Sequence, residues 1–350
     1  MTISRIGDGI ATAIGSLPHI NINEALDLIF NTTPQIPSWP QLPRRSPVEL
    51  MEFQSGVGFP GAIPNRSIGK IMIDREAALT VIPQFYEKIL ADDIDFLAYD
   101  PDVAPGLYAF ADRISKTNSS SLVAVKGQLI GPVTFATSVV DTSRRAIFYD
   151  STLLDIAIQL LMAKAKHQYK VLMNLCNNVV IFFDEPCLAA FGSAYFPPTA
   201  EEISRCLQQI LEPLNSLGAI TGIHCCGNTS WPLLLQSGAK VINFDSFEFF
   251  ERFKLYPLEI ASFLNREGIL ALGISPTDER IHNISENSLA EMLHSQIEEL
   301  VSLTGVTKQK LMSQLLLTPA CGFGTSTIDA ATASLNMIHR LSEQVMSGSF

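Results

Sequence analysis

One histidine and two cysteines have the spacing of metal ligands. His224 and Cys226 lie two residues apart at the end of an apolar run, and Cys321 follows another apolar run 95 residues later. Side chains two residues apart in an extended segment point to the same side, so His224 and Cys226 can share one ligand sphere. An imidazole and two thiolates suit Zn²⁺, and three protein ligands leave a fourth position for water or substrate, as in catalytic zinc sites. The alternative is that these are ordinary core residues, because cysteine is often buried.

Acidic side chains follow two further apolar runs. Asp184 and Asp245 each come directly after such a run, and Glu248 stands close behind Asp245. Asp184 is a candidate active-site acid, although a carboxylate before a proline is also typical of a turn or a helix cap. Either Asp245 or Glu248 could be a fourth, displaceable zinc ligand or a partner that orients His224. We favour Asp245, because it directly follows the apolar run.

Two uncharged polar residues complete the set of candidates. Ser16 follows the first apolar run, and Gln128 follows the third. Each residue is ordinary when considered alone. The carboxyl ends of parallel strands meet at one face of a barrel, where barrel enzymes carry out their chemistry. We therefore expect Ser16 and Gln128 to contribute to substrate binding near the metal ligands.

The elements that must position these residues alternate between strands and helices. Short apolar runs predict eight buried strands, at 10–15, 95–99, 122–126, 179–183, 219–223, 240–244, 269–273 and 314–317. Helical spacing predicts helices at 22–30, 76–90, 104–114, 153–175, 200–217, 257–265, 288–303 and 328–346. Eight strand-helix units predict an α/β fold of the closed (β/α)8 barrel (TIM barrel) type. A doubly wound open sheet is the alternative.

One long region interrupts this alternation. Residues 34–66 hold seven of the 20 prolines in the chain. Long loops in compact domains usually have a function, so we expect this Pro-rich loop to act as a lid or an interface arm. Because the candidate residues spread from Ser16 to Cys321, a single barrel domain over residues 1–350 is expected to include this loop.

Composition excludes several classes of protein. The chain has 350 residues, of which 47% are hydrophobic, and its formal net charge is −11. Nucleic-acid binding is not expected, because it needs concentrated positive charge. The sequence shows neither an apolar signal region nor an apolar run of membrane-spanning length, so a cytoplasmic location without membrane partners is expected. Six cysteines are too few for a disulfide framework.

Five motifs taken in order resemble a known family. These motifs are Ile14-Gly15-Ser16-x-Pro18, Lys126-Gly127-Gln128-x-x-Gly131-Pro132, Asp184-Glu185-Pro186, His224-x-Cys226 and Pro319-x-Cys321-Gly322. Together they are similar to the C-terminal catalytic barrel of cobalamin-independent methionine synthase, within the superfamily that includes uroporphyrinogen decarboxylase. The resemblance covers nearly the whole chain.

The resemblance implies a zinc-dependent methyltransferase that methylates a zinc-bound thiol, with homocysteine as acceptor and methionine as product. Zinc would be held by His224, Cys226 and Cys321, and Asp245 would take the place of the family's acidic ligand. The amino acid head of homocysteine would lie near Ser16 and Asp184. The family's glutamate that binds the amino group has no secure match in the loop around residues 39–43.

Two departures from the family affect the expected methyl donor. The full-length family members carry a second, N-terminal barrel that helps to hold folate, for which 350 residues leave no room. They also have a histidine after the seventh strand, whereas residues 273–277 read Gly-Ile-Ser-Pro-Thr. We therefore expect methylcobalamin, free or on a separate corrinoid protein, rather than methylfolate. The alternatives are a corrinoid-dependent methyltransferase for another small thiol, a metal-free decarboxylase-like enzyme, and an accessory protein with structural zinc.

Overall fold

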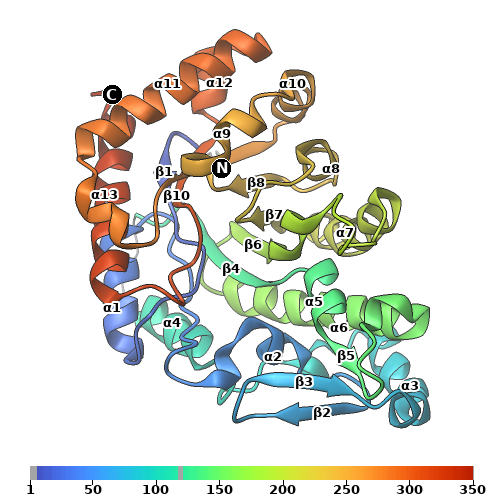
Figure 1. Ribbon diagram of the computed structural model, residues 1–350. Coiled ribbons are helices and arrows are strands. Elements are labelled where there is room, and N and C mark those ends of the chain that lie inside the picture. The colour runs from blue at the N-terminus through green and yellow to red at the C-terminus, as the bar shows by residue number, and fades with distance from the viewer. Residues whose placement is uncertain (1–5, 117–120, 350) are drawn as a thin grey trace.

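A curled parallel sheet surrounded by helices dominates the computed structural model, which describes residues 6–116 and 121–349 (Figure 1). The strand order in this seven-stranded sheet is β1-β10-β9-β8-β7-β6-β4. Its strands are β1 (Ile10–Ala11), β4 (Val125–Ile130), β6 (Val179–Asp184), β7 (Ile220–Cys225), β8 (Val241–Phe244), β9 (Ile269–Ser275) and β10 (Leu315–Pro319). All the pairings between them are parallel, so their carboxyl ends lie on the same side of the sheet.

Helices follow most of these strands and cover the outer face of the sheet (Figure 1). The longer helices are α1 (Ile22–Thr32), α3 (Arg75–Leu90), α4 (Pro105–Lys116), α6 (Ser151–Met173), α7 (Ala200–Ser216), α9 (Ser246–Phe253), α10 (Pro257–Asn265), α11 (Glu286–Thr304) and α13 (Ile328–Ser347). The shorter ones are α2 (Met51–Gly56), α5 (Pro132–Ser138), α8 (Trp231–Leu235) and α12 (Lys308–Met312). The predicted α/β alternation is therefore confirmed. None of the helices in the described ranges is apolar over a length that would cross a lipid bilayer.

The predicted strand at 95–99 is wrong. Residues Ile94–Leu97 form a 3₁₀ helix instead, and the side chain of Asp93 accepts a hydrogen bond from the backbone N–H of Phe96 at its start. A second, three-stranded sheet that the sequence pattern did not predict lies at the edge of the molecule, with the order β2-β3-β5 (Figure 1). It consists of β2 (Ala62–Asn65), β3 (Lys70–Ile73) and β5 (Val140–Asp141).

Segment 35–41 lies between the two edge strands of the main sheet. The N–H of Lys126 on β4 donates to the carbonyl of Pro37, and the N–H of Gln41 donates to the carbonyl of Gly15 just after β1. Only isolated parallel bridges form, Ser38 with Lys126 and Ser16 with Gln41. The ladder is interrupted because proline has no backbone N–H to donate. The predicted closed eight-stranded barrel is therefore replaced by a seven-stranded sheet whose edges are bridged by an irregular segment.

Two buried amides hold this segment in place. The indole N–H of Trp39 donates to Oε1 of Gln168 on α6 at 2.9 Å, and the amide of Gln168 donates to the carbonyl of Gln128 at 3.0 Å. The side-chain amide of Gln128 in turn donates to the carbonyl of Trp39 at 2.9 Å. All three side chains are fully buried. The polar groups that the irregular segment leaves unpaired are thus satisfied by side chains rather than by a ladder.

A buried lysine lies beside this network. Lys164 on α6 is 1% exposed, its Nζ lies 3.3 Å from the carbonyl of Ala98, and it lies 4.9 Å from the ring centroid of Tyr99. Burial lowers the pKa of Lys164 to about 8, while Asp100 acts in the opposite direction. Keeping Lys164 protonated at neutral pH therefore costs the folded state free energy relative to the unfolded state.

We predict a specific pH dependence for Lys164→Met. Because the folded state holds the Lys164 proton less tightly than the unfolded state, the free energy of unfolding of the wild type should rise relative to the variant between pH 8 and pH 10.5. The rise is at most about 1.4 kcal/mol per pH unit, and the difference should be constant below pH 8. Urea unfolding at several pH values measures it.

The control is Ile156→Met, a buried position of the same helix that removes no titratable group. Its difference from the wild type should not change with pH. A Lys164→Met difference that is equally flat would contradict the buried-charge interpretation.

Candidate metal centre and active site

The structure brings His224, Cys226 and Cys321 together. His224 lies on β7, Cys226 directly follows this strand, and Cys321 lies two residues after β10. Their ligand atoms, one ring nitrogen and two sulfurs, all lie within 4.8 Å of one another. Because β8 and β9 separate β7 from β10 in the sheet, it is the curl of the sheet that makes this approach possible.

The ring of His224 is oriented for ligation through Nε2. Its Nδ1 lies 2.5 Å from Oδ1 of Asn243, whereas its Nε2 is buried and has no hydrogen-bond partner among the described residues. A buried polar atom without a partner costs free energy unless something else satisfies it. This nitrogen and the two sulfurs lie close enough together to bind one metal ion. Two thiolates with one imidazole are a typical zinc donor set.

The two thiols interact strongly with each other. The neighbouring Cys321 thiol and His224 imidazole lower the pKa of Cys226, and the Cys226 thiolate in turn raises the pKa of Cys321 by interaction with its thiol and by charge repulsion. The pair therefore favours a thiolate at Cys226 and a neutral thiol at Cys321. A divalent cation would relieve the repulsion between two thiolates, which is the usual electrostatic reason for thiolate ligation.

Asp184 lies at the end of β6 beside the metal-ligand candidates. It is 8% exposed, and its Oδ1 has no hydrogen-bond partner among the described residues. Burial raises the pKa of Asp184, while His224 and Lys126 oppose this shift by charge attraction. A partly unsatisfied buried carboxylate of this kind can accept hydrogen bonds from a cationic group of a ligand.

A buried ammonium lies beneath this carboxylate. Lys126 is fully buried, its Nζ donates to the carbonyl of Ile14 at 2.6 Å, and it lies 4.4 Å from the ring centroid of Phe182. Burial lowers the pKa of Lys126, and attraction to Asp184 acts in the opposite direction. Charge attraction between Lys126 and Asp184 thus favours the charged forms of both groups against the effect of burial.

The three metal-ligand candidates and Asp184 line a cavity of about 440 Å³. Its wall consists of Ile14, Ser16, Gln41, Pro43, Arg44, Glu49, Leu50, Met51, Asp184, Pro186, His224, Cys226, Cys321, Gly322, Gly324 and Thr325. The predicted Ser16 is part of this wall, and its Oγ accepts a hydrogen bond from the N–H of Gly324 at 3.3 Å. A Cβ atom at Gly322 would lie 2.1 Å from that Oγ, so glycine allows the loop after β10 to approach Ser16. The volume suits a small organic molecule.

The Pro-rich region supplies cavity residues that sequence reasoning missed. Glu49 is 1% exposed and accepts hydrogen bonds from Nε of Arg45 at 2.6 Å and from the N–H of Leu42 at 3.1 Å. Burial raises the pKa of Glu49, although Arg45 opposes the shift. Arg44 lies at the rim and donates to the carbonyl of Thr325 at 2.7 Å. The only signal in the sequence was the length of this loop.

Gln128 and Asp245 lie outside the cavity wall. The amide of Gln128 donates to the carbonyl of Trp39, so it holds segment 35–41. Asp245 caps α9 by accepting a hydrogen bond from the N–H of Glu248 at 2.9 Å, and burial raises its pKa to about 6. Asp245 is not among the three residues whose ligand atoms lie within 4.8 Å. Ligation by Asp245 would require its side chain to leave the cap.

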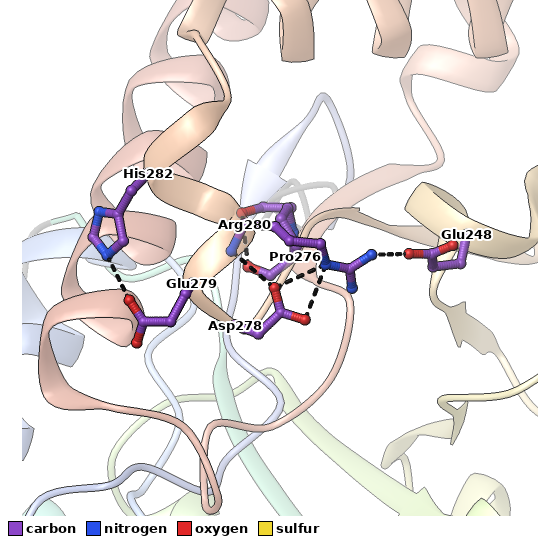
Figure 2. Close-up of polar contacts among 7 residues, drawn as sticks. Glu248, Pro276, Asp278, Glu279, Arg280 and His282 are labelled. Atoms are coloured by element: carbon purple, nitrogen blue, oxygen red, sulfur yellow. Dashed lines mark hydrogen bonds and ion pairs between the residues drawn. The ribbon is translucent and has the colours of Figure 1, made fainter.

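Glu248 is engaged elsewhere (Figure 2). Its exposed carboxylate forms an ion pair with Arg280, whose Nε also donates to Asp278 at 2.9 Å. In the same loop, His282 lies 3.4 Å from the carboxylate of Glu279. Of the two acids considered as a fourth ligand, Glu248 is thus the one with a charged partner.

Solved structures with a similar fold include two that are described as methionine synthases. A B12-independent methionine synthase from Shewanella sp. W3-18-1, in complex with selenomethionine, is 14% identical with a TM-score of 0.55, and the match covers 97% of this chain and 98% of that one. A putative vitamin-B12 independent methionine synthase from Listeria monocytogenes is 14% identical with a TM-score of 0.56, covering 93% and 85%. Scans against protein-family models and curated proteins give no match. At this identity, the similarity shows a shared fold.

We predict that zinc protects two specific cysteines from alkylation. In metal-free protein, Cys226 and Cys321 are half-buried cavity residues and should react with iodoacetamide, Cys321 more slowly because its pKa is raised, whereas the buried Cys206 and Cys225 should not. Added zinc should slow the reaction of Cys226 and Cys321, because ligation occupies the sulfur lone pairs. Peptide mass spectrometry measures each site.

Cys176 is the internal control, because it is half-buried and lies before the amino end of β6, away from the cavity. Its reaction rate should not respond to zinc. If zinc leaves the rates at Cys226 and Cys321 unchanged as well, these residues do not bind it.

Proposed function

We propose that this protein is a zinc-dependent methyltransferase that moves a methyl group to the thiol of a small substrate, with homocysteine as acceptor and methionine as product. The observation that carries this proposal is the group His224, Cys226 and Cys321, with an orphaned Nε2, at the wall of a cavity that also holds the buried Asp184. The shared fold with methionine synthase structures, one of them in complex with selenomethionine, supports it.

The zinc ion would be held by His224, Cys226 and Cys321. When bound, it supplies electrostatic stabilisation of a substrate thiolate, since a free thiol is mostly protonated at neutral pH. We further propose Asp245 rather than Glu248 as a displaceable fourth ligand. Glu248 is paired with Arg280, whereas Asp245 is close enough to His224 for the charge of this ring to oppose the burial that raises the pKa of Asp245.

The residues of the cavity would bind and orient the acceptor. Asp184 and Glu49 are buried carboxylates that can accept hydrogen bonds from the ammonium of an amino acid. Ser16 lies on the same wall and presents a hydroxyl to the carboxylate end. Apolar side chains of Ile14, Leu50 and Met51 exclude water from the remaining space. Holding the acceptor in one orientation lowers the entropic part of the barrier.

The transfer itself requires little chemistry from the chain. The sulfur of the acceptor forms a bond to the methyl carbon while the bond from that carbon to the donor breaks, and the electron pair of the broken bond stays with the donor. The thiol proton is lost to solvent before transfer. Binding, orientation and exclusion of water are therefore the main contributions of the protein.

We propose methylcobalamin, carried by a corrinoid protein, as the methyl donor rather than methylfolate. The segment at the end of β9 supports this, because residues 273–277 are Gly, Ile, Ser, Pro and Thr where the family that the sequence resembles has a histidine. The nearest histidine in the following loop, His282, is directed at Glu279 and Asp329, 3.4 and 3.3 Å away (Figure 2 shows the former contact). The solved neighbours are described as B12-independent, so the donor needs a direct test.

The proposed activity predicts methionine formation from homocysteine and methylcobalamin by protein that holds about one zinc per chain. Cys321→Ser should abolish methyl transfer and lower the zinc content while the circular dichroism spectrum stays native, because it removes one ligand of three. Methionine is measured by mass spectrometry and zinc by elemental analysis.

Cys206→Ser, at a buried cysteine on α7 away from the cavity, is the matched control and should keep both zinc and activity. If protein purified under reducing conditions contains no zinc by elemental analysis, the proposed metal site is wrong. Turnover with methyltetrahydrofolate alone would overturn the proposed donor.

Asp184→Asn tests recognition of the amino group. We expect the KM for homocysteine to rise roughly tenfold or more, because a hydrogen bond to a charged group contributes about 1.5–3 kcal/mol. The KM for 4-mercaptobutyric acid, which lacks the amino group, should change little. Asp278→Asn, at an exposed carboxylate outside the cavity wall, is the control. Equal losses with both thiols would show that Asp184 does not read the amino group.

A further inference from the structure

Asn243 is a buried amide whose contacts reach three other strands. It lies on β8 and is fully buried. Its Nδ2 donates to the carbonyl of Ala271 on β9 at 2.8 Å and to Oγ1 of Thr318 on β10 at 2.7 Å. Its Oδ1 lies 2.5 Å from Nδ1 of His224 on β7. One side chain therefore connects the strand that carries His224 with the strand that leads to Cys321.

The contacts of Asn243 determine which way its amide faces. A backbone carbonyl can only accept hydrogen bonds, so the NH₂ group must face Ala271 and the oxygen must face His224. Both hydrogens of the NH₂ group are then used, one by Ala271 and one by Thr318. The reversed amide would place two acceptors against each other at Ala271. Its orientation is therefore fixed by its surroundings.

The orientation of Asn243 in turn fixes the tautomer of His224. An amide oxygen can only accept, so Nδ1 of His224 must carry a hydrogen. In the neutral ring, Nε2 then holds the lone pair, and Nε2 is the atom that lies beside the two sulfurs with no hydrogen-bond partner in the described part of the chain. The imidazole is thus prepared for ligation before any metal arrives.

The hydrogen bond from Asn243 to Thr318 acts on the end of β10, from which the chain leads to Cys321. Thr318 is fully buried, and the register between β10 and β9 shifts directly after it, between Thr318 and Pro319. Cys321 follows this shift by two residues. A hydrogen bond to Oγ1 of Thr318 holds the last regular residue of β10, from which the chain leads to the second sulfur ligand.

We propose that Asn243 is a positioning residue of the metal centre, which fixes the Nδ1-protonated tautomer of His224 and anchors the end of β10 that carries Cys321. This inference rests on the proposed zinc site and adds the residue that orients it. Loss of such a hydrogen-bond partner of a ligating histidine typically weakens metal binding about 10–100-fold.

The first test measures zinc affinity in the full chain by competition with a colorimetric chelator. Asn243→Ala should weaken zinc binding about 10–100-fold. Asn243→Asp keeps an acceptor for Nδ1 of His224 but loses the donors, so its loss should be smaller. Thr318→Val removes only the contact with β10 and should also give a partial loss.

The matched control is Gln314→Ala. Gln314 is also a buried amide that donates to two backbone carbonyls, those of Leu264 and Gly268, but it lies before the amino end of β10. It should keep wild-type zinc affinity. Equal zinc affinity in Asn243→Ala and the wild type would overturn the proposal, and so would equal losses in Asn243→Ala and Gln314→Ala.

A second measurement does not depend on zinc. In metal-free protein labelled with ¹⁵N at histidine, at a pH where the rings are neutral, the wild type should show His224 protonated at Nδ1. Asn243→Ala should shift this signal, which is assigned by its absence in His224→Gln. A wild-type ring protonated at Nε2 would overturn the inference. A wild type with the expected tautomer that binds no zinc would instead contradict the proposed function alone.

Discussion

The unpaired edges of a curled parallel sheet are the constraint on which the rest of this structure depends. Exposed N–H and C=O groups at β1 and β4 must find partners, and segment 35–41 provides them on both sides. Its prolines prevent a regular ladder, so the amides of Gln128 and Gln168 complete the pairing. The chain that leaves this segment crosses the carboxyl ends of the strands and forms one wall of the cavity. Closure of the sheet and construction of the site are therefore achieved by the same stretch of chain.

The interior of the sheet balances charges rather than excluding them. Lys126 is buried without an ion pair to any described carboxylate, and its hydrogen bonds go to a carbonyl and an amide oxygen. Asp184 and Glu49 are buried on the cavity side. Desolvation disfavours each charge, and attraction between opposite charges offsets part of that cost. A ligand that carries both a cationic and an anionic group suits such a site, because it adds charges of both signs next to partners of the opposite sign.

The sequence predicted the parts of the fold that depend on local pattern. Apolar runs located six strands of the main sheet, β4 and β6 to β10, and the pair His224-x-Cys226 with Cys321 located the metal-ligand candidates. The extended segment 35–41 was not predicted, because its prolines interrupt the pattern of a strand. Residues 95–99 were wrongly predicted as a strand, because apolar content alone does not separate a strand from a buried 3₁₀ turn. Gln128 lies within β4 rather than after its end, and tertiary contacts with Trp39 use its amide. Such long-range pairings have no signature in a single sequence.

Alternation along β7 has a consequence for folding. His224 and Cys226 face the cavity because they are two residues apart, while Cys225 between them is buried on the opposite face. Side chains in a strand alternate with a period of two, so a shift of β7 by one residue would turn Cys225 and Ile223 toward the cavity and remove the histidine from it. A misregistered strand would thus offer a thiol but no imidazole. A metal ion would therefore bind the native register of β7 more tightly than the register shifted by one residue, and its binding would stabilise the native pairing.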